Sequence, residues 1–269
     1  MDDQKHLTIL KNLGRAEDAV RNLGFHPIFV ALHGSQNYGL DVNTDEYRSD
    51  FDYKCIVLPT LRDLTYNCKP VSVVVDFEGG HIDIKDIRVF MDTAVKMNPS
   101  YLEMFFTPYY IYADEGKWIQ AIREIVPYLL AERGALFAKA TYGMFLEKEK
   151  AMCHPYPTTA HKIEKWGYDG KQVHHMYRLL LLLKDFCNTG TIVLTPPTNE
   201  IEFLIDLKLN HYSLDQANKM VAKWKQEINE VRSRVEDKYK DIRSDAANIM
   251  ITMSRNAVFD FCCTEKGRG

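Results

Sequence analysis

The pattern of apolar and polar residues changes near residue 100, from strand-like runs to helical spacing. Ahead of the strand-like runs, residues 4–23 predict an amphipathic helix, because apolar side chains recur every three or four positions. These side chains are Leu7, Leu10, Leu13, Ala16 and Val20.

Three stretches before residue 90 have the composition and alternation of β-strands. The first, FHPIFVALHGS, follows Gly24 and ends at Gly34, and the second covers residues 51–57. The third, VSVVVDFEGGHIDIKDI, predicts two strands joined by a turn at residues 78–80, because Glu-Gly-Gly supplies turn-forming residues there. We therefore expect a small β-sheet in the first part of the chain.

The sheet is expected to lead into helices. Asp86 can cap a helix that runs to Met97, and the Asn-Pro pair at residues 98–99 would end it. Between residues 100 and 265 the apolar periodicity is almost entirely helical.

A long helix is expected in this part, because Ser213 and Gln216 form a capping-box pattern for a helix that reaches about residue 240. The outline is an α+β fold, with a small mixed β-sheet core followed by an all-helical C-terminal half. We expect two domains, residues 1–110 and residues 111–269.

Composition and charge describe an ordinary globular protein. Of 269 residues, 46% are hydrophobic and 26% are charged. A net charge of −3 argues against attraction of the whole surface to nucleic acid, but allows a local basic patch. No apolar run approaches the roughly 20 residues of a membrane span, and the acidic N-terminus does not resemble a signal peptide. The six cysteines lack paired spacing, so we expect reduced thiols, a cytoplasmic protein and no membrane partner.

Candidate chemistry gathers around the second predicted strand. Gly34 and Ser35 follow the first strand, and a glycine backbone with a serine hydroxyl is suited to contacting a phosphate. Asp50 and Asp52 are two residues apart, so a strand would place both carboxylates on one face. Asp83 stands alone between isoleucines on a later strand. Three neighbouring carboxylates repel one another, and two divalent cations would relieve that repulsion while holding substrate phosphates.

The order of these elements resembles the DNA polymerase β-like nucleotidyltransferase superfamily, with Gly-Ser, then Asp-x-Asp/Glu, then a third acid on a later strand. More narrowly, GSQNYGL and SDFDYKCIVLP are similar to predicted nucleotidyltransferases found with RNA-repair operons and in phage genomes. That group also shows an acid on an apolar strand leading into a helix, here HIDIKDIRVF, and an NPxxLE motif, here NPSYLEMFF. KQVHHMYRLL at residues 171–180 extends the resemblance, because such proteins often carry Lys, His and Arg there.

The resemblance implies a metal-dependent enzyme that transfers a nucleoside monophosphate from an NTP to an acceptor hydroxyl and releases pyrophosphate. Residues 1–110 would form its catalytic core. Gly34 and Ser35 would hold the nucleotide phosphates, and Asp50 and Asp52 would ligate Mg²⁺ (or Mn²⁺). Asp83 would complete the metal site and help to deprotonate the acceptor. The loop DVNTDEYR is longer than usual for the group, which bears on substrate preference.

A basic stripe is expected on the later helix. Lys171, His175 and Arg178 are spaced i, i+4 and i+7, with His174 beside them. Facing a cleft, they would bind the triphosphate or the acceptor backbone. The alternative is a solvated face with a hydrogen-bonded histidine, and the sequence favours neither.

The acceptor stays open at the level of sequence. The resemblance favours an RNA end, such as that of a tRNA, whereas a protein side chain or a small molecule such as an aminoglycoside suits the same active site. A non-catalytic nucleotide- or RNA-binding module on the same fold is a further alternative. All three acids are present, which favours the enzyme. Oligomeric state and base preference cannot be inferred from the pattern.

Overall fold

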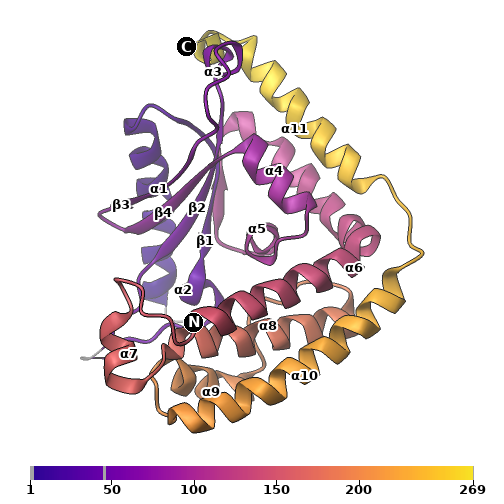
Figure 1. Ribbon diagram of the computed structural model, residues 1–269. Helices are drawn as coiled ribbons and strands as arrows, with labels where there is room; N and C mark the ends of the chain where they lie inside the picture. Colours follow the sequence, from indigo (N-terminus) through magenta and orange to yellow (C-terminus); the bar gives the residue numbers. More distant parts are fainter. Residues whose placement is uncertain (1–2, 45–46, 269) are drawn as a thin grey trace. The chain divides into compact units, whose positions relative to one another are not determined.

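The computed structural model describes residues 3–44 and 47–268, and the chain forms two compact units (Figure 1). The first unit comprises Met1–Glu132 and Arg243–Gly269, and the second comprises Arg133–Ile242. The end of the chain therefore returns to the first unit, so the compact units do not divide at residue 110. The assignment of functions to residues 1–110 and 111–269 stays a prediction.

In the described residues, a five-stranded sheet with the order β3-β4-β2-β1-β5 forms the centre of the first unit. Its strands are β1 (His26–His33), β2 (Asp52–Leu58), β3 (Ser72–Phe77), β4 (Gly80–Asp86) and β5 (Tyr110–Tyr112). β2 and β4 run parallel, whereas the other neighbouring pairs run antiparallel. This mixed sheet, followed by helices, confirms the α+β fold class.

Helix α1 (Asp3–Asn22) covers one face of the sheet (Figure 1). The helix contributes four fully buried residues to the core with β1, β2 and β4, namely Ile9, Leu13, Ala16 and Val20. The predicted stripe was partly wrong, because Leu7 is 66% exposed and Leu10 is 44% exposed. Ile9 continues the spacing of the buried residues by four positions, so the face that packs is rotated away from both leucines.

Short helices cover the opposite face of the sheet (Figure 1). They are α4 (Ile87–Val95), α5 (Pro99–Leu102) and the 3₁₀ turn η1 (Glu103–Phe105). The Asp86 carboxylate accepts a hydrogen bond from the Arg88 N–H, which confirms Asp86 as the cap of α4. Asn98 does not merely end that helix, because its side chain caps α5 by accepting from the Ser100 N–H.

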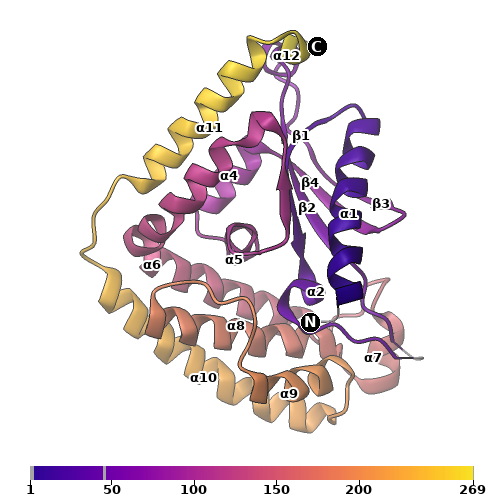
Figure 2. The same cartoon turned by 180° about the vertical axis from the view of Figure 1, so that it is seen from behind.

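The last helices complete the first unit. They are α11 (Ala246–Cys262), which runs beside α4, and α12 (Glu265–Arg268), which contacts α3 (Leu61–Thr65) (Figure 2). The Phe261 side chain is 4% exposed and lies 5.0 Å, centroid to centroid, from the His26 ring at the start of β1. The same unit contains η2 (Asp114–Gly116) and the first part of α6 (Trp118–Ala151).

The second unit is helical. It contains the rest of α6, together with α7 (Ala160–Trp166), α8 (Gly170–Thr189), α9 (Thr198–Lys208) and α10 (Leu214–Tyr239). The α6 backbone leaves helical geometry at Arg133, where the two units divide. Both α9 and α10 pack on α8. Ser213 and Gln216 make both hydrogen bonds of a capping box at the start of α10, which confirms that prediction.

Two elements differ from the prediction. The Gly-Ser turn is the start of a short helix, α2 (Gly34–Tyr38), which follows β1 directly. Strand β5 lies in the part predicted to be helical, and its three residues are too few to show an alternating pattern.

All six cysteines are free, in agreement with their spacing. In the described part of the chain, no helix combines the length and apolar character that crossing a bilayer requires.

Candidate functional site

Gly34 and Asp52 lie against each other at the ends of two paired strands. β1 ends at His33 and β2 begins at Asp52, and these two residues are partners in the antiparallel register. Gly34 has a φ of +73°, and a Cβ atom at this position would overlap an Asp52 carboxylate oxygen. Glycine satisfies both the left-handed backbone and the close approach. The Gly-Ser pair and the Asp-x-Asp pair of the predicted motif therefore lie next to each other in the fold.

Asp50 and Asp52 share one face of the sheet with His81. His81 is the partner of Asp52 in the parallel β2–β4 register, and its Nε2 lies 3.9 Å from an Asp50 carboxylate oxygen. Its Nδ1 makes a 2.6 Å hydrogen bond to Asp76. That bond raises the pKa of His81, and the charges of Asp50 and Asp52 add to the effect. The Asp50 side chain is 70% exposed, so this end of the site is open to solvent.

Asp83 lies further along the same face and contacts two lysines. In the β2–β4 register its partner is Lys54, which follows Asp52 by two residues and so points to the same side. The Lys54 Nζ lies 3.6 Å from one Asp83 oxygen, and the Lys85 Nζ lies 3.0 Å from the other. Two ammonium groups thus face one carboxylate.

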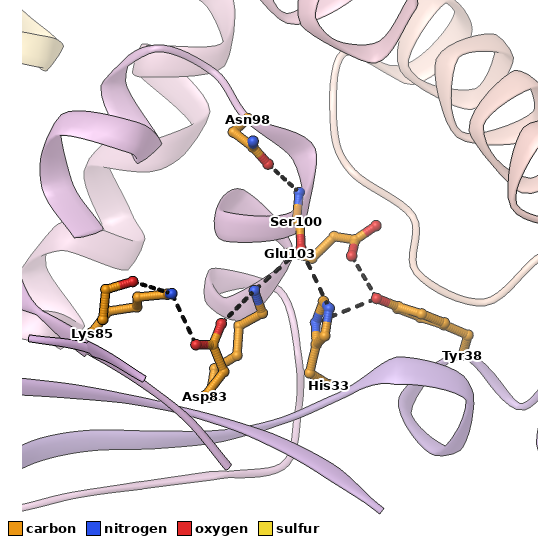
Figure 3. A network of polar contacts seen from close by, with 9 residues as sticks. His33, Tyr38, Asp83, Lys85, Asn98, Ser100 and Glu103 are labelled. Atoms are coloured by element: carbon orange, nitrogen blue, oxygen red, sulfur yellow. Dashed lines mark hydrogen bonds and ion pairs between the residues drawn. The ribbon is translucent and has the colours of Figure 1, made fainter. Parts of the chain in front are cut away.

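A polar network on this face includes Ser100, His33, Tyr38 and Glu103 (Figure 3). Lys54 donates to the Ser100 hydroxyl at 3.2 Å, and the Ser100 Oγ lies 3.4 Å from the His33 Nε2. The other His33 nitrogen lies 3.4 Å from the Tyr38 hydroxyl, which donates to Glu103 at 2.5 Å. The network therefore joins the GSQNY segment to the NPSYLE segment and to the lysine beside Asp83.

Lys54 and Glu103 are buried charges within this network. Lys54 is 7% exposed, and its Nζ lies 4.7 Å from the centroid of the Tyr101 ring. Glu103 is fully buried. Burial lowers the pKa of Lys54, whereas the carboxylates of Asp83 and Glu103 act in the opposite direction. Buried charges require such partners, because an unpaired ion is strongly destabilising in a low dielectric.

The carboxylates of this face are of the kind that bind a divalent cation. Among the described residues, no three His, Cys, Asp or Glu side chains are placed to hold a metal ion. Mg²⁺ typically takes one or two protein carboxylates together with phosphate oxygens, and Asp50 and Asp52 supply that donor set. The Asp83 oxygens contact Lys54 and Lys85, and the part of Asp83 in a metal site stays a prediction.

The predicted basic stripe lies on α8 in the second unit, whereas the aspartates belong to the first. Lys171 is exposed and Arg178 is buried. Burial lowers the pKa of His175 far below its usual value, so its ring is neutral at pH 7 and adds no positive charge for a phosphate. His174 is buried and makes a 2.8 Å hydrogen bond to the Leu204 carbonyl. Nucleotide contact by Lys171, His175 and Arg178 stays a prediction.

Lys54 and His81 were not among the site residues predicted from the sequence. Lys54 is the one charge inside the otherwise apolar YKCIVL run, and it shares the parity of Asp50 and Asp52. His81 shares the parity of Asp83. Both signals were readable from strand alternation, but the register that pairs Lys54 with Asp83 was not.

In comparisons with known proteins, no family model and no curated protein matches the sequence. A solved structure, described as a nucleotidyltransferase-like protein from Exiguobacterium sibiricum 255-15, is similar over 91% of this chain and 79% of its own. The two share 10% sequence identity with a TM-score of 0.29, so the likeness carries no argument about what this chain does.

Proposed function

We propose that this protein is a metal-dependent nucleotidyltransferase that transfers a nucleoside monophosphate from an NTP to an acceptor hydroxyl. The observation that supports it most directly is the contact between Gly34 and the Asp52 carboxylate. A phosphate approaching the bare backbone at Gly34 would also approach the carboxylates that suit its cation. Asp50, on the same face as Asp52, supplies the second carboxylate.

In this reaction the acceptor hydroxyl oxygen forms a bond to the α-phosphorus of the NTP. The bond from that phosphorus to the oxygen bridging to the β-phosphate breaks, and pyrophosphate leaves. The hydroxyl proton passes to solvent, to which the Asp50 end of the site is open. A bound Mg²⁺ would neutralise phosphate charge, held by Asp50 and Asp52. The protein contributes position and charge and forms no covalent intermediate.

An RNA end is the acceptor we propose first, following the sequence resemblance. Purified protein is incubated with α-³²P-labelled NTPs and Mg²⁺ in separate reactions with total tRNA, cell-lysate protein and aminoglycosides. Label carried by the RNA fraction supports RNA as the acceptor. Label on protein or on the aminoglycoside would instead identify that molecule as the acceptor. NTP binding without transfer to any acceptor would favour the non-catalytic alternative.

The first prediction concerns Asp52. Asp52→Asn removes the charge but keeps the size of the side chain, so transfer is expected to fall by about 100-fold or more, as happens when a group that stabilises transition-state charge is lost. Mg²⁺-dependent NTP binding should weaken with it. The initial rate of transfer of label and calorimetric NTP binding give the two readouts.

Asp92→Asn is the matched control, because Asp92 is an exposed aspartate on α4 in the same unit. It should transfer label at the wild-type rate. Circular dichroism establishes that both variants are folded. A folded Asp52→Asn protein with undiminished transfer would contradict the proposed function.

A further inference from the structure

We infer that the ammonium group of Lys54 takes the place of one of the two cations used by two-metal nucleotidyl-transfer sites, so that this site binds a single divalent cation. The inference rests on the proposed function and concerns how that site neutralises charge. It is carried by the position of Lys54, which follows Asp52 by two residues on β2 and lies opposite Asp83 on β4, on one face of the sheet.

The strand register places Lys54 where a second cation would need to be. β2 and β4 are parallel, with Asp52 opposite His81 and Lys54 opposite Asp83. The direct neighbour of Asp83 across the strands is therefore a lysine, while Asp52 is offset by two residues. A cation bridging Asp52 and Asp83 would have to lie close to the Lys54 ammonium, and like charges repel strongly in a shielded site.

The Asp83 carboxylate already has two ammonium groups as partners, and the other acid near Lys54, Glu103, is fully buried. Lys54 and Lys85 approach different oxygens of the carboxylate, at 3.6 Å and 3.0 Å. One carboxylate is thus already matched by two ammonium groups. The exposed end of the face has the opposite balance, because Asp50, Asp52 and Asp76 gather there around one histidine, His81.

Lys54 cannot leave as an exposed lysine would. Its ammonium donates to the Ser100 hydroxyl and lies against the Tyr101 ring, and the side chain is almost fully buried. Moving it away from Asp83 would break a buried ion pair and leave both charges without that partner, which costs several kcal/mol in typical proteins. Its charge is therefore a fixed part of the site.

The test counts the metal ions directly. Wild-type protein is mixed with Mn²⁺ and an equimolar mixture of the four α,β-methylene NTP analogues, and electron paramagnetic resonance spectra are recorded in frozen solution. Two Mn²⁺ ions about 4 Å apart, as in two-metal sites, give an exchange-coupled spectrum that differs from that of one isolated ion. We expect an isolated-ion spectrum and a stoichiometry of one Mn²⁺ per chain.

Two variants separate the aspartates. Asp83→Asn should keep the single bound Mn²⁺ with an affinity within about threefold of wild type, whereas Asp52→Asn should lose it. In Lys54→Met, transfer should fall about 10- to 100-fold with the Mn²⁺ spectrum retained, because the positive charge that takes the place of a second cation is lost but the metal ligands stay. Lys96→Met, at an exposed lysine of the same unit, should change neither readout.

The outcomes distinguish this inference from the proposed function. An exchange-coupled spectrum in an active wild-type protein overturns the role of Lys54 and leaves the proposed function standing. Loss of Mn²⁺ from a folded Asp83→Asn protein has the same meaning. Wild-type protein that binds no Mn²⁺ with any analogue overturns both. The wild-type spectrum decides the question even if a variant fails to fold.

Discussion

At the scale of single residues, the site depends on small spaces as much as on charges. Gly34 is where the chain passes from β1 into α2, with its φ in the left-handed region and its Cα against Asp52. A side chain there would displace the carboxylate that the proposed chemistry requires. The candidate site is therefore more sensitive at Gly34 than at many of its polar positions.

Gly34→Ala is expected to lose stability and NTP binding together. A left-handed alanine costs about 1–2 kcal/mol, and the clash with Asp52 adds to it. Gly14→Ala is the control, because Gly14 lies inside α1 with open space around its Cα, and alanine there should stabilise the helix by about 0.5–1 kcal/mol. Urea denaturation and analogue binding measure both. A Gly34→Ala protein as stable as wild type would contradict the description of this turn.

At this scale, the carboxylates of the site could be predicted from the sequence, but their cross-strand partners could not. Asp50, Asp52 and Asp83 could be placed on one face from alternation alone, because the side-chain period of a strand is two. Their partners depend on strand register, and a shift of two residues would have placed Asp83 opposite Asp52 with the same alternation. Lys54 therefore became apparent only in the fold.

At the scale of elements, strong local signals were predictable and weak ones were not. The Asp86 cap and the Ser213 capping box fixed the starts of α4 and α10, because each side chain satisfies a free backbone N–H of the first turn. Strand β5 has three residues and, among the described strands, pairs with β1 alone, so its existence depends on tertiary contacts. The face that α1 buries was also set by packing on the sheet.

A buried histidine in α8 should make the stability of the helical unit depend on pH. Burial lowers the pKa of His174 to about 3, so the folded protein keeps this ring neutral. Between the unfolded-state pKa of about 6.5 and pH 3, the unfolded chain binds a proton that the folded chain does not, so stability is full above pH 6.5 and falls as the pH falls. The loss at pH 5 is about 2 kcal/mol for His174. His175, whose pKa is also lowered, acts in the same direction.

His174→Asn tests this dependence. The amide cannot titrate but can still donate to the Leu204 carbonyl, the partner of His174. Urea denaturation at pH 7.5 and pH 5, followed by the helical circular-dichroism signal, should show a smaller acid destabilisation in the variant than in wild type. His211→Asn, at an exposed histidine of the same unit, should keep the wild-type dependence. An equal pH dependence in all three proteins would refute the role assigned to His174.

At the scale of the whole molecule, the order of elements along the chain differs from their grouping in space. The helical unit, residues 133–242, interrupts the first unit, whose last two helices come from the end of the chain. Composition and periodicity showed where helices begin, but they do not report which helix packs on which unit. That is why the division expected at residue 110 differs from the compact units.

Paired phenylalanines of α11 test this grouping. Phe261→Ala should destabilise the sheet unit by about 3 kcal/mol, because the buried ring packs near His26 and its loss leaves a cavity. Phe259→Ala, at a ring that is 69% exposed, should have little effect. Hydrogen exchange of β1 and β2 amides reports the change. If the β1 amides of Phe261→Ala exchanged as slowly as those of wild type, α11 would not contribute to the stability of the sheet unit.

The return of α11 to the first unit has a consequence for biosynthesis. A ribosome releases β1, β2, β4 and α4 early, but α11, which packs beside α4, is translated only after all of residues 133–242. From the end of β4 at residue 86 to the end of α11 at residue 262, translation at about 5–20 residues per second takes roughly 9–35 s. During this interval the surface later covered by α11 is available to chaperones, and the helical unit can finish folding first.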